Sequence, residues 1–511
     1  MNATKATSDS MTDSGWNTSD KLVLALLLAL TILRSIVIFL SPLELGVDEA
    51  QYWLWSQTFE FGYFTKPPLT SWIIGSAHAT LGHHIWAIRL PAPWLHLITA
   101  LVLWRAAFWI GGPVTGRRAG HLASLLWISL PAVAIGSFVI STDTPMLLFW
   151  SLGLLALTGV IVGKVSPRAM MLFAGGAFGA AMLAKYAAIY SVLGLVLFFC
   201  LDRIYHRQKH LSLTALVLFS GGMILVASPN LVWNLTHDFT TVRHLGDNAN
   251  LDQQSYSLIN SLEFIAAQFA TAGPFVFLLM LGIMRPNRGA NPDHVMPVNR
   301  LLLCMSAPII AIIALQAFLS EANANWALAA MPALVLWLAS WLAKLKPTRF
   351  GYNWPANLAI GVNIGLAAVF LIVSWTGSLA IVGPLAPSSD PLRRLRGWEQ
   401  LAADTAAVLD KTAASAVIAN SRAAAALLSW HFHDRNIEIL VHDADGVPSN
   451  HFEANLAWQQ QRGRRLVALH SSERPPVLPN IQWDAENDLS DVRISVNRTR
   501  RLFISSGVEA D

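Results

Sequence analysis

The sequence predicts a polytopic α-helical membrane protein that ends in a small soluble α/β domain. Hydrophobic residues make up 54% of its 511 residues and charged residues only 13%, about half the charged share of an ordinary soluble domain. Its twenty tryptophans fit a chain that crosses the membrane interface many times, because indole rings favour the headgroup zone. Charged residues become frequent again only in the last quarter of the chain. The small net charge of +4 gives no reason to expect a nucleic-acid partner.

The N-terminal segment predicts a cytoplasmic tail followed by a retained membrane helix. Residues 1–20 are polar and rich in Ser, Thr and Asp, without a basic region or a small-residue cleavage site. The apolar run 22–40 is long enough to span a bilayer and does not have the pattern of a signal peptide. Cys200 and Cys304 both lie inside apolar runs, so neither a disulfide framework nor a cysteine metal site is expected.

Hydrophobic runs of about 17 to 25 residues predict about eleven spanning helices. They lie near 22–40, 88–110, 119–139, 145–163, 169–184, 186–201, 213–228, 262–284, 300–319, 327–344 and 356–380. The runs 169–184 and 186–201 have almost no linker, so they are either two helices or one long tilted helix. Together with their connections, these runs define a transmembrane domain over 21–384.

Basic residues predict the orientation, because cytoplasmic loops are enriched in Lys and Arg. With a cytoplasmic N-terminus, the outer loops before the tail hold only Lys66, Lys185 and Arg243, with Arg89 at a boundary. The inner segments hold fifteen basic residues: Lys5, Lys21, Arg117, Arg118, Lys164, Arg168, Arg203, Arg207, Lys209, Arg285, Arg288, Arg300, Lys344, Lys346 and Arg349. This asymmetry places the loop 41–87, the turn "STDTP", the loop 229–261, the turn "SEANANW" and the tail on the outer side.

The tail over 385–511 is predicted to be a periplasmic α/β domain. Short β-like runs such as "IEILVHD", "RRLVALHS" and "RLFISS" alternate with the Ala-rich helical stretch "WEQLAADTAAVLDKTAASAV". The length is close to the usual minimum for a domain. We find no internal repeat, which gives no support to an inverted-repeat transporter.

The first outer loop contains an acidic pair at the start of a predicted helix. In "GVDEAQYWLWSQTFEFGYFTKPPLTSW", over 46–72, Asp48 and Tyr52 are four residues apart and share a helix face. Acidic residues stabilise a helix N-terminus, and the aromatic residues after them anchor a helix at the interface. The pair is explained either by that structural role or by chemistry at the membrane surface, and the pattern alone leaves both open.

Lysines on the outer side can meet an anion at the headgroup level. Lys66 directly precedes Pro67 and Pro68, which favour an extended approach and then a new helix. Lys185, followed by Tyr186, falls at the outer end of its helix. Each lysine can hold a phosphate as a point charge or can simply extend its amino group to the interface.

The other outer loops add polar candidates. Asp143 lies in a tight turn before Thr144 and Pro145, where an acid can cap the next helix. The loop 229–261 holds His237, Asp238 and Arg243, and the turn near 320–326 holds Asn325. The histidine spacing matches no zinc pattern, so no cofactor is expected, and a divalent metal has no ligand pattern to support it. Together these residues predict an outer cavity lined by carboxylates and lysines. Arg34, inside the first span, requires a partner or an aqueous cavity.

Four motifs in this order resemble the GT-C fold glycosyltransferases. They are "DE" followed by a Tyr, "KPPL", "IRLPA" at 88–92 and Asp-x-Pro in the second outer turn. The nearer match is to families 39 and 83, the bacterial relatives of protein O-mannosyltransferases and lipid A aminoarabinose transferases. The resemblance covers roughly 20–345 and is strongest over 46–92.

The resemblance implies transfer of one sugar, with inversion, from a polyprenyl-phosphate donor to an acceptor at the periplasmic side of a bacterial inner membrane. Asp48 takes the place of the first-loop catalytic acid and Glu49 that of its neighbour, while Asp143 matches the acid of the second loop. Lys66 matches the lysine of "KPP". With Lys66, the expected substrate-binding residues are Tyr52, Tyr63, Arg89, Lys185, Tyr186, His237, Asp238, Arg243 and Asn325.

The chemistry fits these residue types. An acceptor hydroxyl loses a proton as it attacks, which calls for a carboxylate base, and a cation stabilises the departing lipid phosphate. This chain has Gln51 and Thr65 where the aminoarabinose transferases have Arg and Glu, so a uronic acid or a neutral hexose is expected at least as much as aminoarabinose. The long lumenal insertion of the protein mannosyltransferases is missing. This favours a glycolipid acceptor, lipid A or lipopolysaccharide core, over a protein.

Three other functions stay open at this point. A transporter or flippase of lipid-linked sugar would place its charges near the bilayer midplane and use broken helices. A non-catalytic assembly subunit would tolerate replacement of Asp48 and Lys66. A protein O-glycosyltransferase would use the same donor chemistry with another acceptor.

Overall fold

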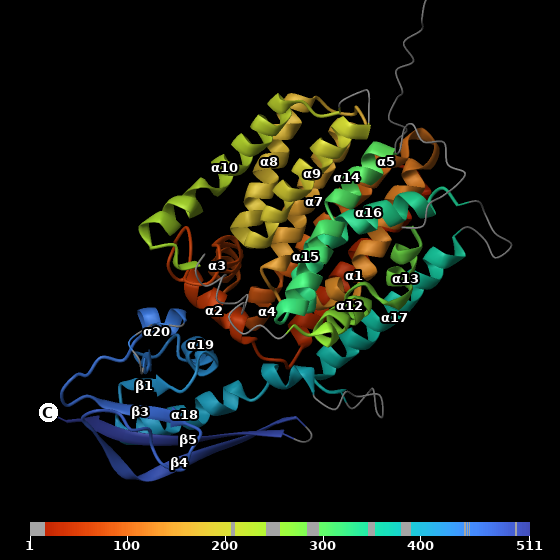
Figure 1. Cartoon of the computed structure of the whole chain (residues 1–511). Coiled ribbons are helices and arrows are strands. Elements are labelled where there is room, and N and C mark those ends of the chain that lie inside the picture. The colour runs from red at the N-terminus through yellow and green to blue at the C-terminus, as the bar shows by residue number, and fades with distance from the viewer. Residues whose placement is uncertain are drawn as a thin grey trace, which may run out of the picture.

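The computed structural model shows a bundle of long helices with a sheet-containing unit at one end (Figure 1). It describes residues 16–205, 210–241, 256–283, 296–345, 353–379 and 390–510, with short gaps at 444–445, 447, 449 and 496–497. The predicted domain boundary between 384 and 385 lies outside the described residues, so that division stays a prediction.

The bundle contains long membrane helices and short connecting helices. The long helices before residue 240 are α1 (Thr18–Leu40), α5 (Pro91–Ser129), α7 (Asp143–Ile161), α8 (Pro167–Ala184), α9 (Tyr190–Tyr205) and α10 (Leu213–Thr236). The later helices are α12 (Leu258–Ala272), α13 (Pro274–Ile283), α14 (Met296–Cys304), α15 (Ala307–Leu319), α16 (Met331–Leu342) and α17 (Trp354–Thr376). The short helices are α2 (Val47–Ser56), α3 (Leu69–Leu81), α4 (Ile85–Arg89), α6 (Pro131–Gly136), η1 (Tyr186–Ile189) and η2 (Ala324–Ala330).

Nine helical stretches of the described chain are long and apolar enough to cross a membrane, and a bent pair makes a tenth. In that pair, α12 and α13 meet at an angle of 110°, so the prediction of one continuous helix over 262–284 is wrong. The break lies at Gly273, whose φ of 84° belongs to the left-handed region that favours glycine. Pro274 follows and begins the next helix. The chain is therefore a multi-pass membrane protein.

The longest stretch is a helical hairpin. Gly112 has φ 60° and ψ −155° inside α5. A Cβ placed on Gly116 would lie 2.4 Å from the carbonyl oxygen of Phe108, and one on Gly120 would lie 2.2 Å from the indole of Trp104. The later glycine, Gly120, therefore packs against the earlier residue, Trp104, and Gly116 packs against Phe108. This order shows that the two arms run antiparallel. Counting the arms separately gives ten candidate spans in the described chain, or eleven with the bent pair. The second arm ends at Ser129, well short of the predicted 139.

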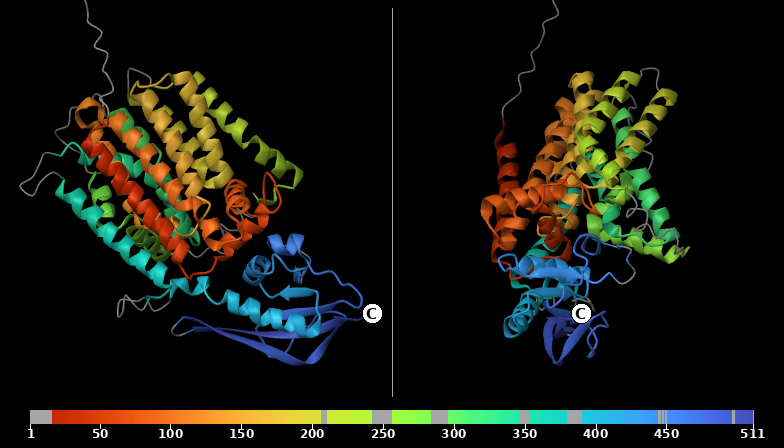
Figure 2. Two further views of the ribbon diagram at one scale, coloured as in Figure 1. Left: turned by 180° about the vertical axis from the view of Figure 1, so that it is seen from behind. Right: turned by 90° about the vertical axis from the view of Figure 1, so that its left-hand side faces the viewer.

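Ion pairs show which helix ends lie together. Asp20, at the start of α1, pairs with Arg117 at 3.2 Å and with His121 at 2.7 Å, both on the second arm of α5. This end of the bundle is opposite to the sheet unit (Figure 2). Arg34 in α1 is buried and donates to the carbonyl of Ile128 at 2.7 Å and to Ser137 Oγ at 3.1 Å. The partner that the sequence required for Arg34 is thus supplied by α5 and the turn after it.

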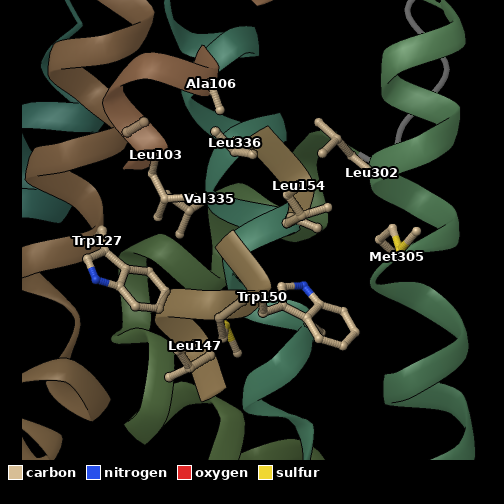
Figure 3. Close-up of a cluster of buried hydrophobic side chains, with 14 of the residues drawn as sticks. Leu103, Ala106, Trp127, Leu147, Trp150, Leu154, Leu302, Met305, Val335 and Leu336 are labelled. Carbon is tan, nitrogen blue, oxygen red and sulfur yellow. The ribbon is translucent and has the colours of Figure 1, made fainter. Parts of the chain in front are cut away.

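The core of the bundle is apolar and closely packed. Figure 3 shows buried side chains of α5, α7, α14 and α16 facing one another, among them Leu103, Ala106, Trp127, Leu147, Trp150, Leu154, Leu302, Met305, Val335 and Leu336. Trp150 meets Phe178 edge to face, with ring centroids 5.1 Å apart. This rigid core fixes the outer helix ends, and those ends carry the candidate site.

The tail forms a five-stranded mixed sheet in the order β2-β1-β3-β5-β4. Its strands are β1 (Ala416–Ala419), β2 (Glu438–Val441), β3 (Arg465–His470), β4 (Ile481–Ser495) and β5 (Arg498–Glu509), with helices α18 (Trp398–Thr412), α19 (Arg422–His431) and α20 (His451–Asn455). Strands β2, β1 and β3 are parallel, whereas β5 and β4 are antiparallel. The predicted helix through residue 417 is wrong at its end, because α18 stops at Thr412 and "AVIA" forms β1, fully buried within the sheet.

The tail is held against the end of the bundle that carries the loop 41–87. Glu44, in the loop after α1, accepts hydrogen bonds from the backbone N–H groups of Gly397, Trp398 and Glu399 at 2.8, 2.6 and 3.1 Å. A carboxylate there satisfies the free N–H groups at the start of α18. Trp53 of α2 meets Trp430 of α19 edge to face at 4.9 Å. The loop 41–87 and the tail therefore share one interface.

Candidate active site

Helix α2 presents its two acidic residues to different surroundings. The helix begins because Glu49 Oε2 accepts a hydrogen bond from the N–H of Gly46 at 2.9 Å, which satisfies one free donor of the first turn. The side chain of Asp48 is 63% exposed, whereas that of Glu49 is 1% exposed. Only Asp48 is open to a substrate.

Glu49 and Arg89 form a buried pair beneath the site. Arg89 donates to the Glu49 carboxylate through Nη2 at 2.8 Å and Nε at 3.0 Å, and to the carbonyls of Leu43 and Glu44 at 3.1 and 2.6 Å. Glu49 also accepts from the N–H of Ile140 at 3.2 Å. The pair fastens the loop before α2 to α4 and to the turn before α7. Catalysis by Glu49 and substrate binding by Arg89 stay predictions, and this geometry favours a positioning role.

Asp143 lies at the centre of a second polar group. Its Oδ1 accepts a hydrogen bond from Lys185 Nζ at 2.7 Å, and its Oδ2 accepts one from Asn325 Nδ2 at 3.0 Å. Lys185 has an extended backbone between α8 and η1, so the predicted runs 169–184 and 186–201 are two helices. The structure thus brings together three predicted residues from three separate turns.

Lys66 is a half-buried lysine of the site that forms no ion pair with the described acids. Among the described residues, its amino group forms no ion pair within 4.0 Å, although Asp48 and Asp143 act on it electrostatically. Burial lowers the pKa of this amino group, and the positive charges of Lys185 and Arg422 lower it further. A buried cation without a bound acid is a favourable place for an anionic ligand.

A cavity of about 250 Å³ opens beside these lysines. Lys66, Lys185 and Tyr186 line it together with Ile312, Ile313 and Gln316 of α15. Cationic side chains and membrane-helix apolar side chains thus meet in one space. Such a lining suits a ligand with an anionic head and a hydrocarbon chain.

Arg422 is the site residue that sequence reasoning missed. It is the first residue of α19 in the tail, and its Nη2 donates to Asp48 Oδ1 while its Nε donates to Gln51 Oε1 at 2.5 Å. For Gln51, the sequence shows a departure from a family pattern but no contact with the tail. No short sequence motif around Arg422 predicts its contact with Asp48, because the two residues are 374 positions apart.

The predicted tyrosines have different surroundings. Tyr52 is buried, and burial, followed by the charge of Asp48, raises the pKa of its phenol well above the usual value. Tyr63 stacks on Trp55 at 5.0 Å and donates to the carbonyl of Thr58 at 2.8 Å, so it holds the loop together. Tyr186 lines the cavity and donates to Asn230 Oδ1 at 2.7 Å. Of the three, only Tyr186 lines the cavity.

The remaining predicted residues do not join this group. His237 ends α10 and stacks on Trp233 at 4.0 Å. Asp238 follows it with φ 52°, and neither lines the cavity. Arg243 lies outside the described residues. Within the described ranges, no three His, Cys, Asp or Glu side chains gather as a metal site.

Comparisons with known proteins agree with this geometry. The family model for dolichyl-phosphate-mannose-protein mannosyltransferases matches residues 65–233. The chain is 32% identical over 471 residues to the lipid A galacturonosyltransferase RgtD of Rhizobium johnstonii, covering 90% of this chain and 94% of that protein. Because the match covers 90% of this chain, it extends over both the membrane bundle and most of the tail.

Solved structures share the fold. The crystal structure of ArnT from Cupriavidus metallidurans bound to undecaprenyl phosphate aligns with a TM-score of 0.60 at 15% identity, covering 95% of this chain and 97% of ArnT. The arabinofuranosyltransferase AftD from Mycobacteria aligns with a TM-score of 0.51 at 14% identity, covering 95% of this chain and 42% of AftD. At these identities the likeness shows the fold, including the outer sheet unit in the ArnT alignment.

Proposed function

This chain belongs to the GT-C fold glycosyltransferases, and on that premise we propose that it transfers one uronic acid from polyprenyl phosphate to lipid A. The uronic acid and the acceptor are suggested by the RgtD relative, whose name specifies galacturonic acid and lipid A. The polyprenyl carrier is suggested by the undecaprenyl phosphate bound to ArnT. The uronic acid agrees with the departures from the aminoarabinose pattern at Gln51 and Thr65.

One observation carries the proposal: Lys66, which has no ion pair in the described chain, lines the cavity, and the exposed carboxylate of Asp48 is near enough to act on it electrostatically. Lys185 is already paired with Asp143 at 2.7 Å, so Lys66 is the cation available to the donor phosphate. The cavity beside it is lined by apolar residues of α15, where the first isoprene units of a lipid carrier can lie. A transporter would instead need such charges near the bilayer midplane.

Asp48 is the group best placed to act as general base. Both carboxylate oxygens of Asp143 already accept hydrogen bonds, and Glu49 is buried in its pair with Arg89. The side chain of Asp48 is mostly exposed, and its Oδ2 accepts no hydrogen bond from the described residues. It accepts the proton of the acceptor hydroxyl as that oxygen attacks the anomeric carbon. The bond from the anomeric carbon to the phosphate oxygen breaks on the opposite face, with inversion of configuration.

The leaving group is polyprenyl phosphate, which gains negative charge as the glycosidic bond to it breaks. The amino group of Lys66 lies where this charge develops, and Lys185 adds a second positive charge nearby. Fixed cations in a partly desolvated site stabilise such charge more than water does. Asn325 and Lys185 hold the carboxylate of Asp143 in place through one hydrogen bond each.

We place the site on the periplasmic side of a bacterial inner membrane. Support comes from the excess of Lys and Arg on the loops of the other side. The ion pairs of Asp20 with Arg117 and His121 lie at that basic end, whereas the sheet unit lies at the end of the candidate site (Figure 2).

The test is mass spectrometry of lipid A from cells with the gene, from cells in which it is deleted, and from deleted cells that carry the Asp48→Asn variant. We expect loss of a single uronosyl increment in the deletion and in the Asp48 variant. Asp410→Asn is the matched control, because Asp410 is exposed and also pairs with a tail arginine, Arg435. Normal lipid A with Asp48→Asn removes Asp48 from the mechanism. Unchanged lipid A with an altered carrier distribution in the deletion supports a flippase instead.

A further inference from the structure

We propose that Arg422 selects the donor sugar by binding the carboxylate of its uronic acid through the free edge of its guanidinium. The inference rests on the proposed function. It adds a residue of the tail to a site that otherwise belongs to the membrane helices, and it names the group on the sugar that this residue recognises.

The guanidinium of Arg422 has donors left over. Nη2 donates to Asp48 and Nε donates to Gln51. In the described chain, Nη1 has no hydrogen-bond partner, and the side chain is 43% exposed. A planar guanidinium binds a carboxylate through adjacent N–H groups. Arg422 can therefore keep Asp48 in place and still offer N–H groups to a ligand.

The arginine is held in place before any ligand binds. Ser421 caps α19 by accepting a hydrogen bond from the N–H of Ala424 at 3.2 Å. The other end of the helix is fixed by Trp430, which meets Trp53 at 4.9 Å. A side chain on a docked helix with two anchored donors loses little freedom on binding a ligand.

The charges of the site leave Arg422 with unused hydrogen-bond donors once the donor phosphate is bound. The acids and bases of the site form two closed pairs, Glu49 with Arg89 and Asp143 with Lys185. Asp48, Arg422 and Lys66 remain and carry one net positive charge among them. A phosphodiester alone, bound at Lys66, would neutralise that charge without using the free edge of Arg422.

Arg422 contacts Asp48 directly, and the charges of both residues act on the amino group of Lys66. A sugar attached to a phosphate at Lys66 can therefore extend toward Asp48 and Arg422. A neutral sugar offers the guanidinium only hydroxyl oxygens. A uronate offers a carboxylate, which forms stronger, charge-assisted hydrogen bonds.

The experiment measures binding of three lipids to the purified full-length chain. The probes are polyprenyl phosphate alone, polyprenyl phosphate carrying galactose, and the same lipid carrying galacturonic acid, which differs from galactose only at C6. The variants are Arg422→Gln, Arg422→Lys and Lys66→Met. Arg435→Gln serves as the matched control, because Arg435 pairs with an exposed acid away from the site.

We expect Arg422→Gln to weaken binding of the uronosyl lipid about 10- to 100-fold, the size of a lost charge-assisted contact. Binding of the other two lipids should change less than about 3-fold. Arg422→Lys should recover part of the preference, and Arg435→Gln should bind like the unaltered protein. Lys66→Met should weaken all three, because every probe carries the phosphate.

Equal weakening of all three lipids by Arg422→Gln would overturn the inference, because it would mean that Arg422 binds the phosphate or only holds the tail in place. Unchanged binding of the uronosyl lipid would overturn it as well. These outcomes are separate from the failure of the proposed function. If the unaltered protein transfers no sugar to lipid A, the proposed function fails. If it transfers the uronosyl unit and Arg422→Gln binds and transfers that unit as well as the unaltered protein does, only the inference fails.

Discussion

The two acids of the "DE" motif are expected to have different roles. Glu49 stabilises the protein through its buried pair with Arg89, and Asp48 takes part in the chemistry. Replacing Glu49 with Gln removes the charge that neutralises a fully buried guanidinium and weakens up to five hydrogen bonds to the carboxylate. Removing one partner of such a pair costs about 3–5 kcal/mol. Asp48 is mostly exposed, and surface ion pairs contribute about 0–1 kcal/mol. Asp48→Asn should therefore leave stability almost unchanged.

The assay is thermal unfolding of the purified protein in detergent, followed by tryptophan fluorescence, together with transfer at a temperature where every variant is folded. We expect Glu49→Gln to lower Tm by several degrees and to keep measurable transfer. Asp48→Asn should keep Tm and lose transfer. A double variant, Glu49→Met with Arg89→Met, should be more stable than Glu49→Met alone, because no unpaired charge stays buried.

A different pattern would refute the positioning role of Glu49. If Glu49→Gln keeps the Tm of the unaltered protein and abolishes transfer, Glu49 takes part in the chemistry. If Asp48→Asn lowers Tm as much as Glu49→Gln does, the contact of Asp48 with the tail is a main source of stability, and its exposure is a poor guide to its role.

Three further predictions follow from the same contacts. Lys185→Met should destabilise the protein by leaving Asp143 uncompensated, and adding Asp143→Asn should restore part of the Tm. Gly120→Ala should lower Tm, because its Cβ would lie 2.2 Å from an indole of the other hairpin arm, whereas Gly221→Ala, with open space around it, should not. His83, in the turn after α3, stacks on Trp430 of α19 with ring centroids 3.6 Å apart. Burial, and then two neighbouring histidines, lower the pKa of His83 to about 4. Docking favours its neutral form, so the tail should dock less well as pH falls from about 6.5 to 4. Fluorescence energy transfer between labels on α3 and α19 should report this, and His83→Gln should weaken the pH dependence.

Much of the site followed from the sequence, because the contributing turns share one side of the membrane. The positive-inside rule placed Lys66, Asp143, Lys185 and Asn325 on the outer side before any contact was known. The structure brings Asp143, Lys185 and Asn325 into direct contact. In a membrane protein, topology restricts each loop to one of two surfaces, so polar residues of the same surface are already candidates for one site.

Arg422 could not be found in this way. Its contact with Asp48 depends on how a separate sheet unit docks onto the bundle, and a single sequence contains no local signal for that docking. The strand at Ala416–Ala419 could not be predicted from the sequence for a related reason. Alanine favours helices, and only pairing with β2 and β3 on both sides makes this segment a strand.

The contacts of the first outer loop argue that the tail and the membrane helices act as one unit. Over ten residues, Glu44 caps α18, Asp48 and Gln51 bind Arg422, and Trp53 packs on Trp430. Two of these residues belong to the candidate site itself. Displacing the tail would free Asp48 from its guanidinium and leave Glu44, now three-fold hydrogen-bonded, without its donors. The predicted boundary near 385 therefore marks a change in composition along the chain, whereas the proposed recognition of the sugar depends on residues from both sides of it.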